Sequence, residues 1–252
     1  MRMNVYKVSL LLGLSVAASS YGSMIGVNFV GNSVAAADYT LTTTQNAGVA
    51  NQVNWNNAKL NSGATADLFG PLAGQLADNT GVDSGAAITW SANGKGKVGR
   101  AGVTDDNVLM NGYLDDSSTV VGNNATVTFG SLNQFAADGY KVYVYFGAAT
   151  DNRTGTISDG TTTFYTKTKS STSYSFPADY TIATSTTDGT YVAANYAVFS
   201  GTADDLTLTY QRDSGNGGIL GIQVVAVPEP ATLGMLGLGT IITLLIRRSV
   251  SA

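Results

Sequence analysis

The chain has 252 residues, a length that suits one domain with a sizeable core. It contains no Cys and no His, which excludes disulfides, Cys or Cys/His zinc sites, thiol nucleophiles and any imidazole acid or base. The formal net charge is −4, and between residues 21 and 227 nine Lys and Arg stand against 16 Asp, a balance of −7. No nucleic-acid partner is therefore expected.

The N-terminal residues have the charge order of a secretory signal peptide. Basic residues precede an apolar run over 8–18, and small residues follow it. We expect a signal peptide at 1–23, cleaved by signal peptidase between Ala18 and Met24, with the small residues at 35–37 as the second candidate. An uncleaved anchor or a buried core helix is the alternative, but the run is short for a span of ~20 apolar residues.

Residues 228–252 combine two prolines, an apolar stretch and an arginine pair. The 16 uncharged residues at 231–246 would extend ~24 Å as a helix, which is close to the thickness of a membrane. By the positive-inside rule, the arginine pair holds the last end in the cytoplasm and leaves the rest of the chain outside. The residues that define this arrangement are Pro228, Glu229, Pro230, Arg247 and Arg248.

This terminal arrangement resembles the PEP-CTERM sorting signal of Gram-negative bacteria. The resemblance covers residues 227–252. It implies recognition of the Pro-Glu-Pro segment by an exosortase, a membrane-embedded transpeptidase-like enzyme, followed by removal of the tail. It also implies an inner-membrane-anchored precursor that becomes a cell-surface or extracellular-matrix protein, of the kind that often accompanies exopolysaccharide and biofilm production.

The body, residues 24–227, is expected to be all-β: a single antiparallel β-sandwich or jelly roll. Gly and Thr are abundant, Glu229 is the only Glu, and short alternating runs recur between turn-forming clusters. Such spacing is typical of about eight or more strands. The clearest candidate strands are 24–30, 88–90, 108–110, 126–129, 140–146, 192–199, 206–210 and 219–227.

Two of these runs predict their own surroundings. The even-numbered residues of 140–146 are apolar and should face the core, whereas Lys141, Tyr143 and Tyr145 should lie on a wet or partly covered face. The run 219–227 is almost continuously apolar, which is typical of a central strand that is covered on both faces.

Turn signals suggest how other strands connect. Asp159-Gly160 lies between two strand-like runs and predicts a hairpin, and Asp188-Gly189 before Tyr191 predicts another. The Ser/Thr-rich stretch 161–187 is expected to form solvated edge strands, because it has too few Lys and Glu for a disordered polyampholyte.

The body also has a looser resemblance to uncharacterised bacterial surface modules that travel with this sorting signal. The residues that carry it are Trp55-Asn56-Asn57, 109–115 and 218–224. The resemblance implies a β-sandwich similar to galactose-binding-like or jelly-roll modules, and it implies no particular ligand.

Sugar binding would use exposed rings that stack on pyranose faces, with amides beside them for the hydroxyls. The alternative is that such rings are core, where each buries ~150–250 Å². That alternative is expected to hold for Trp90. The candidate sugar-binding residues are Trp55, Asn56, Asn57, Asn111, Tyr113, Tyr143 and Tyr145.

Calcium is the natural cation for a chain rich in Asp without His or Cys, because hard cations take carboxylate and amide oxygens. No EF-hand pattern is present, and no other cofactor is expected. The candidate calcium ligands in loops are Asp105, Asp106, Asn107, Asp151 and Asn152.

These observations predict an exported, non-enzymatic surface or matrix protein with a structural or adhesive role that includes polysaccharide binding. Two alternatives stay open. One is a calcium-binding adhesion module. The other is a glycoside hydrolase in which two Asp from the pairs 105–106, 115–116 and 204–205 converge, since neighbours within one pair on a strand point to opposite faces.

Overall fold

The computed structural model describes residues 23–31, 39–59, 61–99, 104–116, 124–136, 138–168 and 176–227. Residues 1–22 of the expected signal peptide, the sorting residues 228–230 with Arg247 and Arg248, and the expected membrane helix lie outside these residues. Within the described ranges, no helix has the length and apolar character needed to cross a membrane.

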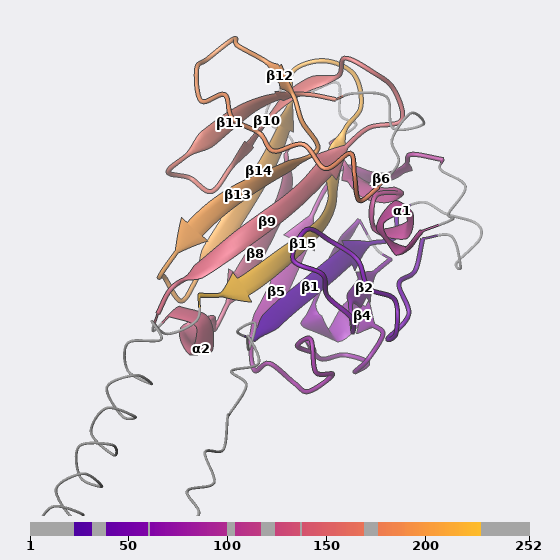
Figure 1. Ribbon diagram of the computed structural model, residues 1–252, viewed down its shortest axis with the longest axis vertical. Helices are drawn as coiled ribbons and strands as arrows, with labels where there is room; N and C mark the ends of the chain where they lie inside the picture. The colour runs from indigo at the N-terminus through magenta and orange to yellow at the C-terminus, as the bar shows by residue number, and fades with distance from the viewer. Residues whose placement is uncertain are drawn as a thin grey trace, which may run out of the picture.

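The described strands form two sheets, which confirms the expected all-β sandwich (Figure 1). The eight-stranded sheet has the order β13-β9-β15-β1-β2-β4, with β7 beside β15 and β6 beside β7. Its strands are β1 (Met24–Phe29), β2 (Asn56–Ala58), β4 (Leu68–Phe69), β6 (Gly94–Lys97), β7 (Gly112–Asp115), β9 (Tyr140–Gly147), β13 (Tyr196–Gly201) and β15 (Gly218–Ala226).

The seven-stranded sheet has the order β12-β11-β10-β14-β8-β5-β3. Its strands are β3 (Ser62–Ala64), β5 (Ala87–Ser91), β8 (Ala125–Gly130), β10 (Thr154–Ser158), β11 (Thr163–Lys167), β12 (Val192–Ala193) and β14 (Leu206–Arg212). Most strand pairs are antiparallel, whereas β1–β2 and β11–β12 are parallel. Short helices complete the described fold: η2 (Thr65–Asp67), α1 (Asp105–Leu109) and α2 (Asn133–Ala136).

The main core lies where the inner faces of the two sheets meet. Ile88 and Val127 of the seven-stranded sheet belong to one buried cluster with Val142 and Ile222 of the eight-stranded sheet. Each such side chain stabilises the fold by about 1.5–3 kcal/mol through leaving water. The alternation of buried and exposed residues in β8 and β5 therefore follows directly from their position with one face on the core.

The strand β15 is covered on both faces, as the sequence predicts. It lies between β9 and β1, and residues 218–224 are all buried. Ile222 packs into the main core, whereas Leu220 on the other face joins a second cluster with Trp55 and Tyr145. A second layer of side chains therefore covers the outer face of the eight-stranded sheet.

Three local expectations are wrong. Residues 108–110 belong to and follow α1 rather than a strand, because the side chain of Thr104 caps the helix by accepting from the Asn107 amide and two Asp occupy its first turn. The run 192–199 is divided between β12 and β13. Asp188-Gly189 lies in a loop turn rather than a hairpin, because β11 and β12 pair in parallel and their connection must cross over.

The hairpin at Asp159-Gly160 is present and joins β10 to β11. Its loop has four residues rather than two, since Ser158 pairs with Thr163. Within 161–187 the only described strand is β11, which lies next to the edge strand β12. The expectation of edge strands in this stretch is therefore wrong, because β11 pairs on both sides and the edge strand β12 lies beyond residue 187.

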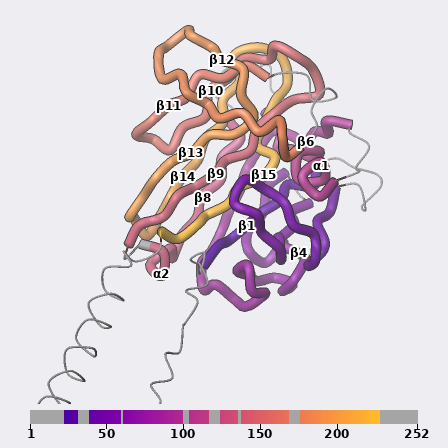
Figure 2. Tube along the Cα trace, in the orientation of Figure 1, coloured from indigo at the N-terminus to yellow at the C-terminus, as the bar shows by residue number. Residues whose placement is uncertain are grey.

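Both ends of the described body lie at one end of the sandwich, here called the terminal end. Met24 pairs with Val225 in the antiparallel β1–β15 ladder, and the Ala226 amide donates to the Ser23 carbonyl at 3.0 Å. Strands β10, β11 and β12 lie toward the opposite, distal end in Figures 1 and 2. The sandwich thus separates its chain ends from its distal surface by the length of the sheets.

Candidate functional site

The outer face of the seven-stranded sheet carries a row of hydroxyl groups. Alternation along each strand turns Thr and Ser outward, and the strand register aligns one of them from each of six strands. Thr163 Oγ1 donates to Ser158 Oγ at 3.0 Å within this row. The row consists of Ser62, Ser91, Thr126, Thr209, Ser158 and Thr163.

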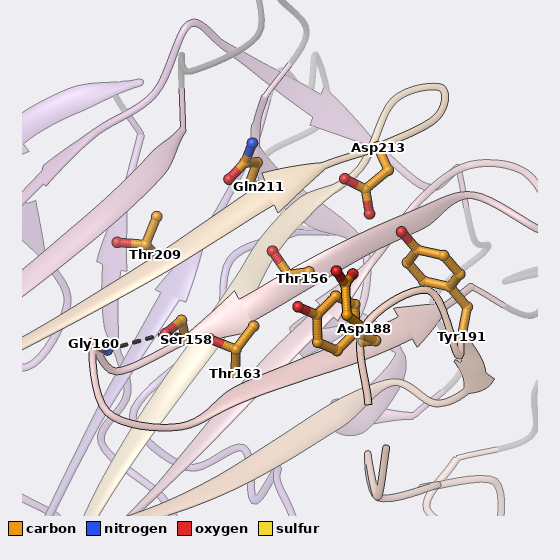
Figure 3. A pocket seen from close by; sticks show the side chains of 10 residues that line it. Thr156, Ser158, Gly160, Thr163, Asp188, Tyr191, Thr209, Gln211 and Asp213 are labelled. Atoms are coloured by element: carbon orange, nitrogen blue, oxygen red, sulfur yellow. Dashed lines mark hydrogen bonds between the residues drawn. The ribbon is translucent and has the colours of Figure 1, made fainter. Parts of the chain in front are cut away.

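One end of this row opens into a groove of about 440 Å³, here called the distal groove (Figure 3). Strands β10, β11 and β14 form its floor, and the loop before β12 supplies Asp188 and Tyr191. The lining is almost entirely polar. Its residues are Thr156, Ser158, Gly160, Thr163, Tyr165, Asp188, Tyr191, Thr209, Gln211 and Asp213.

Two tyrosine rings in this groove lie beside two carboxylates. The ring centroids of Tyr165 and Tyr191 lie 5.9 Å apart, with an interplanar angle of 70°. A hydrogen bond to Asp213 is the main cause that raises the pKa of Tyr191 to about 12, and partial desolvation and the charge of Asp213 add to it. Figure 3 shows the Tyr191 hydroxyl pointing toward Asp213.

The second pair has the same chemistry. Desolvation raises the pKa of Tyr165, and the charge of Asp188 and a hydrogen bond to it raise it further. Both phenols are therefore neutral at neutral pH, and each lies beside a carboxylate. The groove offers fixed rings, carboxylate oxygens and hydroxyls, without a basic side chain in its lining.

Three of the four rings proposed for sugar stacking are buried: Trp55, Tyr113 and Tyr145. The Trp55 ring meets Tyr145 edge-on at 6.5 Å, and its Nε1 donates to the Gln52 carbonyl at 2.8 Å. The expectation that these rings are exposed is corrected by their burial, because α1 and the loop that contains Gln52 cover this face of the eight-stranded sheet. They cannot meet a ligand in this arrangement.

Tyr143 is half-buried and stacks on Tyr196 with ring centroids 6.4 Å apart. It does not line the distal groove. Tyr143 therefore remains partly accessible, but at a place other than the groove.

The three amides proposed for sugar hydroxyls are also buried, and two of them bind backbone. Asn56 Nδ2 donates to the Gly26 and Ala77 carbonyls at 2.9 and 2.8 Å. Asn57 Oδ1 accepts from the Leu41 amide at 3.0 Å. Asn111 is fully buried, beside the turn into β7. The side chains of Asn56 and Asn57 therefore fasten loops to the eight-stranded sheet.

Asp105 and Asp106, proposed as calcium ligands, hold a loop against α1. Asp105 accepts from Gln45 Nε2 at 3.0 Å, whereas Asp106 accepts from the Gly48 amide and the Tyr180 hydroxyl, both at 2.7 Å. Burial is the main cause that raises the pKa of Asp106, and Asp105 adds to it.

The other proposed calcium ligands are Asn107, Asp151 and Asn152. Asn107 lies in α1, and its amide binds the Thr104 cap. Asp151 and Asn152 are exposed in a turn where Asn152 has a φ of 58°. Over the described part of the chain, no group of three or more acidic side chains is arranged to hold a metal ion. Calcium binding stays a prediction.

The groove residues Tyr165, Asp188, Tyr191 and Asp213 escape sequence reasoning. The available signal is the alternation of Thr163, Tyr165 and Lys167 in the Ser/Thr-rich stretch, which indicates an outward face. Nothing in the sequence shows that the crossover loop returns Asp188 and Tyr191 to that face.

Comparison with known proteins identifies a sorting motif near the C-terminus of the chain. Residues 226–249 match the PEP-CTERM protein-sorting motif. No curated protein matches the chain. With its two-sheet body, the chain is therefore an exported protein of the all-β class. More particularly, it carries the sorting motif that marks a substrate of an exosortase, which agrees with a location at the cell surface.

Proposed function

We propose that this protein is a non-enzymatic surface or extracellular-matrix protein that binds polysaccharide in the distal groove. The observation that supports this most directly is the pair of rings Tyr165 and Tyr191, which lie beside two carboxylates in a polar groove on a sheet face. Ring faces pack on sugar rings, while Asp188, Asp213 and the hydroxyls of the floor bind sugar hydroxyls. A groove of this kind suits a modest affinity for each sugar unit.

The hydroxyl row supports binding of a polymer rather than a single sugar. Thr163, Ser158 and Thr209 belong to both the groove and the row, which continues over β8, β5 and β3. A chain that leaves the groove along this row would meet further hydroxyls at the spacing of neighbouring strands, about 4.8 Å.

The position of the groove supports an adhesive role. The precursor would be cut by signal peptidase and held in the inner membrane by its C-terminal helix until the exosortase acts. The groove lies toward the distal end, away from the strand ends at Met24 and Ala226 (Figure 1). Many copies on one surface would raise the avidity for a shared polymer without tight single sites.

The chemistry of the groove favours binding over hydrolysis. Its two carboxylates lie beside neutral phenols, which suits them to accept hydrogen bonds rather than to act as a proton donor and a free base. The proposed calcium ligands, in α1 at 105–107 and in the turn at 151–152, lie outside the groove.

Retention of the full chain, purified in mild detergent, on a panel of immobilised polysaccharides tests the binding. Replacement Tyr191→Ala or Tyr165→Ala should abolish retention, whereas Tyr143→Ala, outside the groove, should preserve it. Chelation should leave retention unchanged. Lack of retention on every polysaccharide, including the matrix of the producing cells, would overturn the binding proposal, and loss on chelation alone would favour the calcium module.

Turnover and route need separate tests. Release of reducing ends from a retained polysaccharide would show that the protein is a hydrolase and not only a binding protein.

Fractionation of cells with and without the exosortase tests the proposed delivery, which predicts accumulation of the uncut precursor in the inner membrane when the exosortase is absent.

A further inference from the structure

We infer that the distal groove selects glycans by charge, binding polymers of amino sugars with free amines more tightly than neutral glycans and excluding polymers rich in uronate or sulfate. This inference rests on the proposed function and adds the substrate class to it. It follows from the balance of charges and of hydrogen-bond acceptors in the groove.

The first step is charge. Asp188 and Asp213 lie at the same end of the groove as Tyr191, and the lining has no Lys or Arg to offset them. Lys167 is two residues beyond Tyr165 in β11 but is not part of the lining. An anionic sugar would bring a like charge to these carboxylates, whereas an ammonium group would find opposite charge.

The second step is the count of donors and acceptors. The carboxylates of Asp188 and Asp213 have lone pairs and no proton to donate, so they present only acceptors to a ligand. The phenol oxygens of Tyr165 and Tyr191 beside them add further lone pairs. This end of the groove is thus rich in acceptors, and an ammonium group, with three donors and no acceptor, satisfies it best.

The third step is the rings. Tyr165 and Tyr191 meet at a steep angle, with centroids 5.9 Å apart and an interplanar angle of 70°. A cation between such rings and the carboxylates gains attraction from a ring face in addition to the ion pairs. The same rings give a neutral sugar only packing. The groove should therefore bind polymers with free amines most tightly, neutral glycans less tightly and anionic glycans least tightly.

The experiment compares binding of the full chain in detergent to three soluble probes: chitosan oligosaccharides, their fully N-acetylated forms of the same length, and polygalacturonate. The double variant Asp188→Asn/Asp213→Asn removes two charges from the groove. The matched control Asp204→Asn/Asp205→Asn removes two exposed charges between β13 and β14. Both variants have the same net charge, so general attraction to a polycation changes equally in the two.

The wild type and the control should bind the free amine about two- to fivefold more tightly than the acetylated form, since an exposed ion pair contributes up to ~1 kcal/mol. The groove variant should lose this ratio, and 0.5 M salt should reduce it in the wild type. Thermal melting of both variants checks that they are folded.

Retention of the full amine preference by the groove variant, or binding of polygalacturonate as tight as that of the amine, would overturn the inference while leaving polysaccharide binding intact. Failure of all three probes, together with failure of the wider polysaccharide panel, would instead overturn the proposed function.

Discussion

The Tyr191 hydroxyl points toward the Asp213 carboxylate, which places the loop before β12 beside the end of β14 (Figure 3). The proximity of Asp213 raises the pKa of Tyr191 to about 12, since the carboxylate favours the neutral phenol. Replacement Asp213→Asn should therefore lower the pKa of Tyr191 by about one unit, toward the ordinary value near 10. Titration of ¹³C-labelled tyrosine by NMR measures it. The same pKa in Asp213→Asn and wild type would refute the contact, and Asp205→Asn serves as the unaffected reference.

Asp115 gives the body a distinct dependence of stability on pH. Burial raises its pKa to about 6, while Arg212 opposes and Asp116 adds to the shift. Because the folded pKa exceeds the unfolded value near 4, its contribution to stability is complete below about pH 4 and is lost as the pH rises through 6.

Urea denaturation at pH 4 and pH 7 tests this contribution. The free energy of unfolding of the wild type, relative to that of Asp115→Asn, should be about 1–2 kcal/mol higher at pH 4 than at pH 7. This figure allows for the opposing effect of Arg212 and for solvent screening. An equal difference at both pH values would contradict the prediction.

Two glycines that face each other across β15 and β9 should differ sharply in their tolerance of alanine. Gly218 pairs with Gly147. A Cβ on Gly218 would lie 1.6 Å from the Leu114 carbonyl oxygen, whereas a Cβ on Gly147 would have its nearest neighbour, Leu220 Cδ1, at 3.4 Å. Gly218→Ala should cost about 3 kcal/mol or more, and Gly147→Ala about 1 kcal/mol or less. Thermal melting that gives similar losses for the two variants would refute this packing at β7.

Trp55 should act on stability and not on sugar binding. It is fully buried against Tyr145, so Trp55→Ala should lower the free energy of unfolding by about 3–5 kcal/mol, and Trp55→Phe by less. Urea denaturation followed by Trp90 fluorescence measures both. The folded Trp55→Phe variant should keep its polysaccharide retention, and a selective loss of retention at unchanged stability would return Trp55 to the binding surface.

Residues whose environment depends on strand periodicity could be predicted from the sequence. The alternation in 140–146 and the continuous apolar run in 219–227 correctly indicated a half-covered strand and a central strand, since burial of one or both faces follows from period two. Thr104 shows a limit, because its capping of α1 overrode the strand-like pattern of 108–110. The burial of Tyr145 could not be predicted from the alternation, because it depends on the loop that covers its ring.

The candidate site could be predicted far less well. Trp55 and Asn57 were plausible ligand residues because exposure cannot be read from residue type, and both are interior. Tyr165 and Tyr191 meet because β12 pairs in parallel with β11, which brings together residues that are far apart in the sequence. Long-range loop placement of this kind leaves no local periodic signal.

The central position of β15 also determines how the body resists being pulled. A force applied at Val227 in the direction away from the body acts along the axis of β15, while the ladder hydrogen bonds to β9 and β1 run across it. These bonds are loaded in shear and must break together, rather than one after another as in peeling from an edge. A polymer held at the distal groove would therefore pull against the two ladders that β15 forms with β9 and β1, and the rate of forced unfolding would be set by their joint rupture.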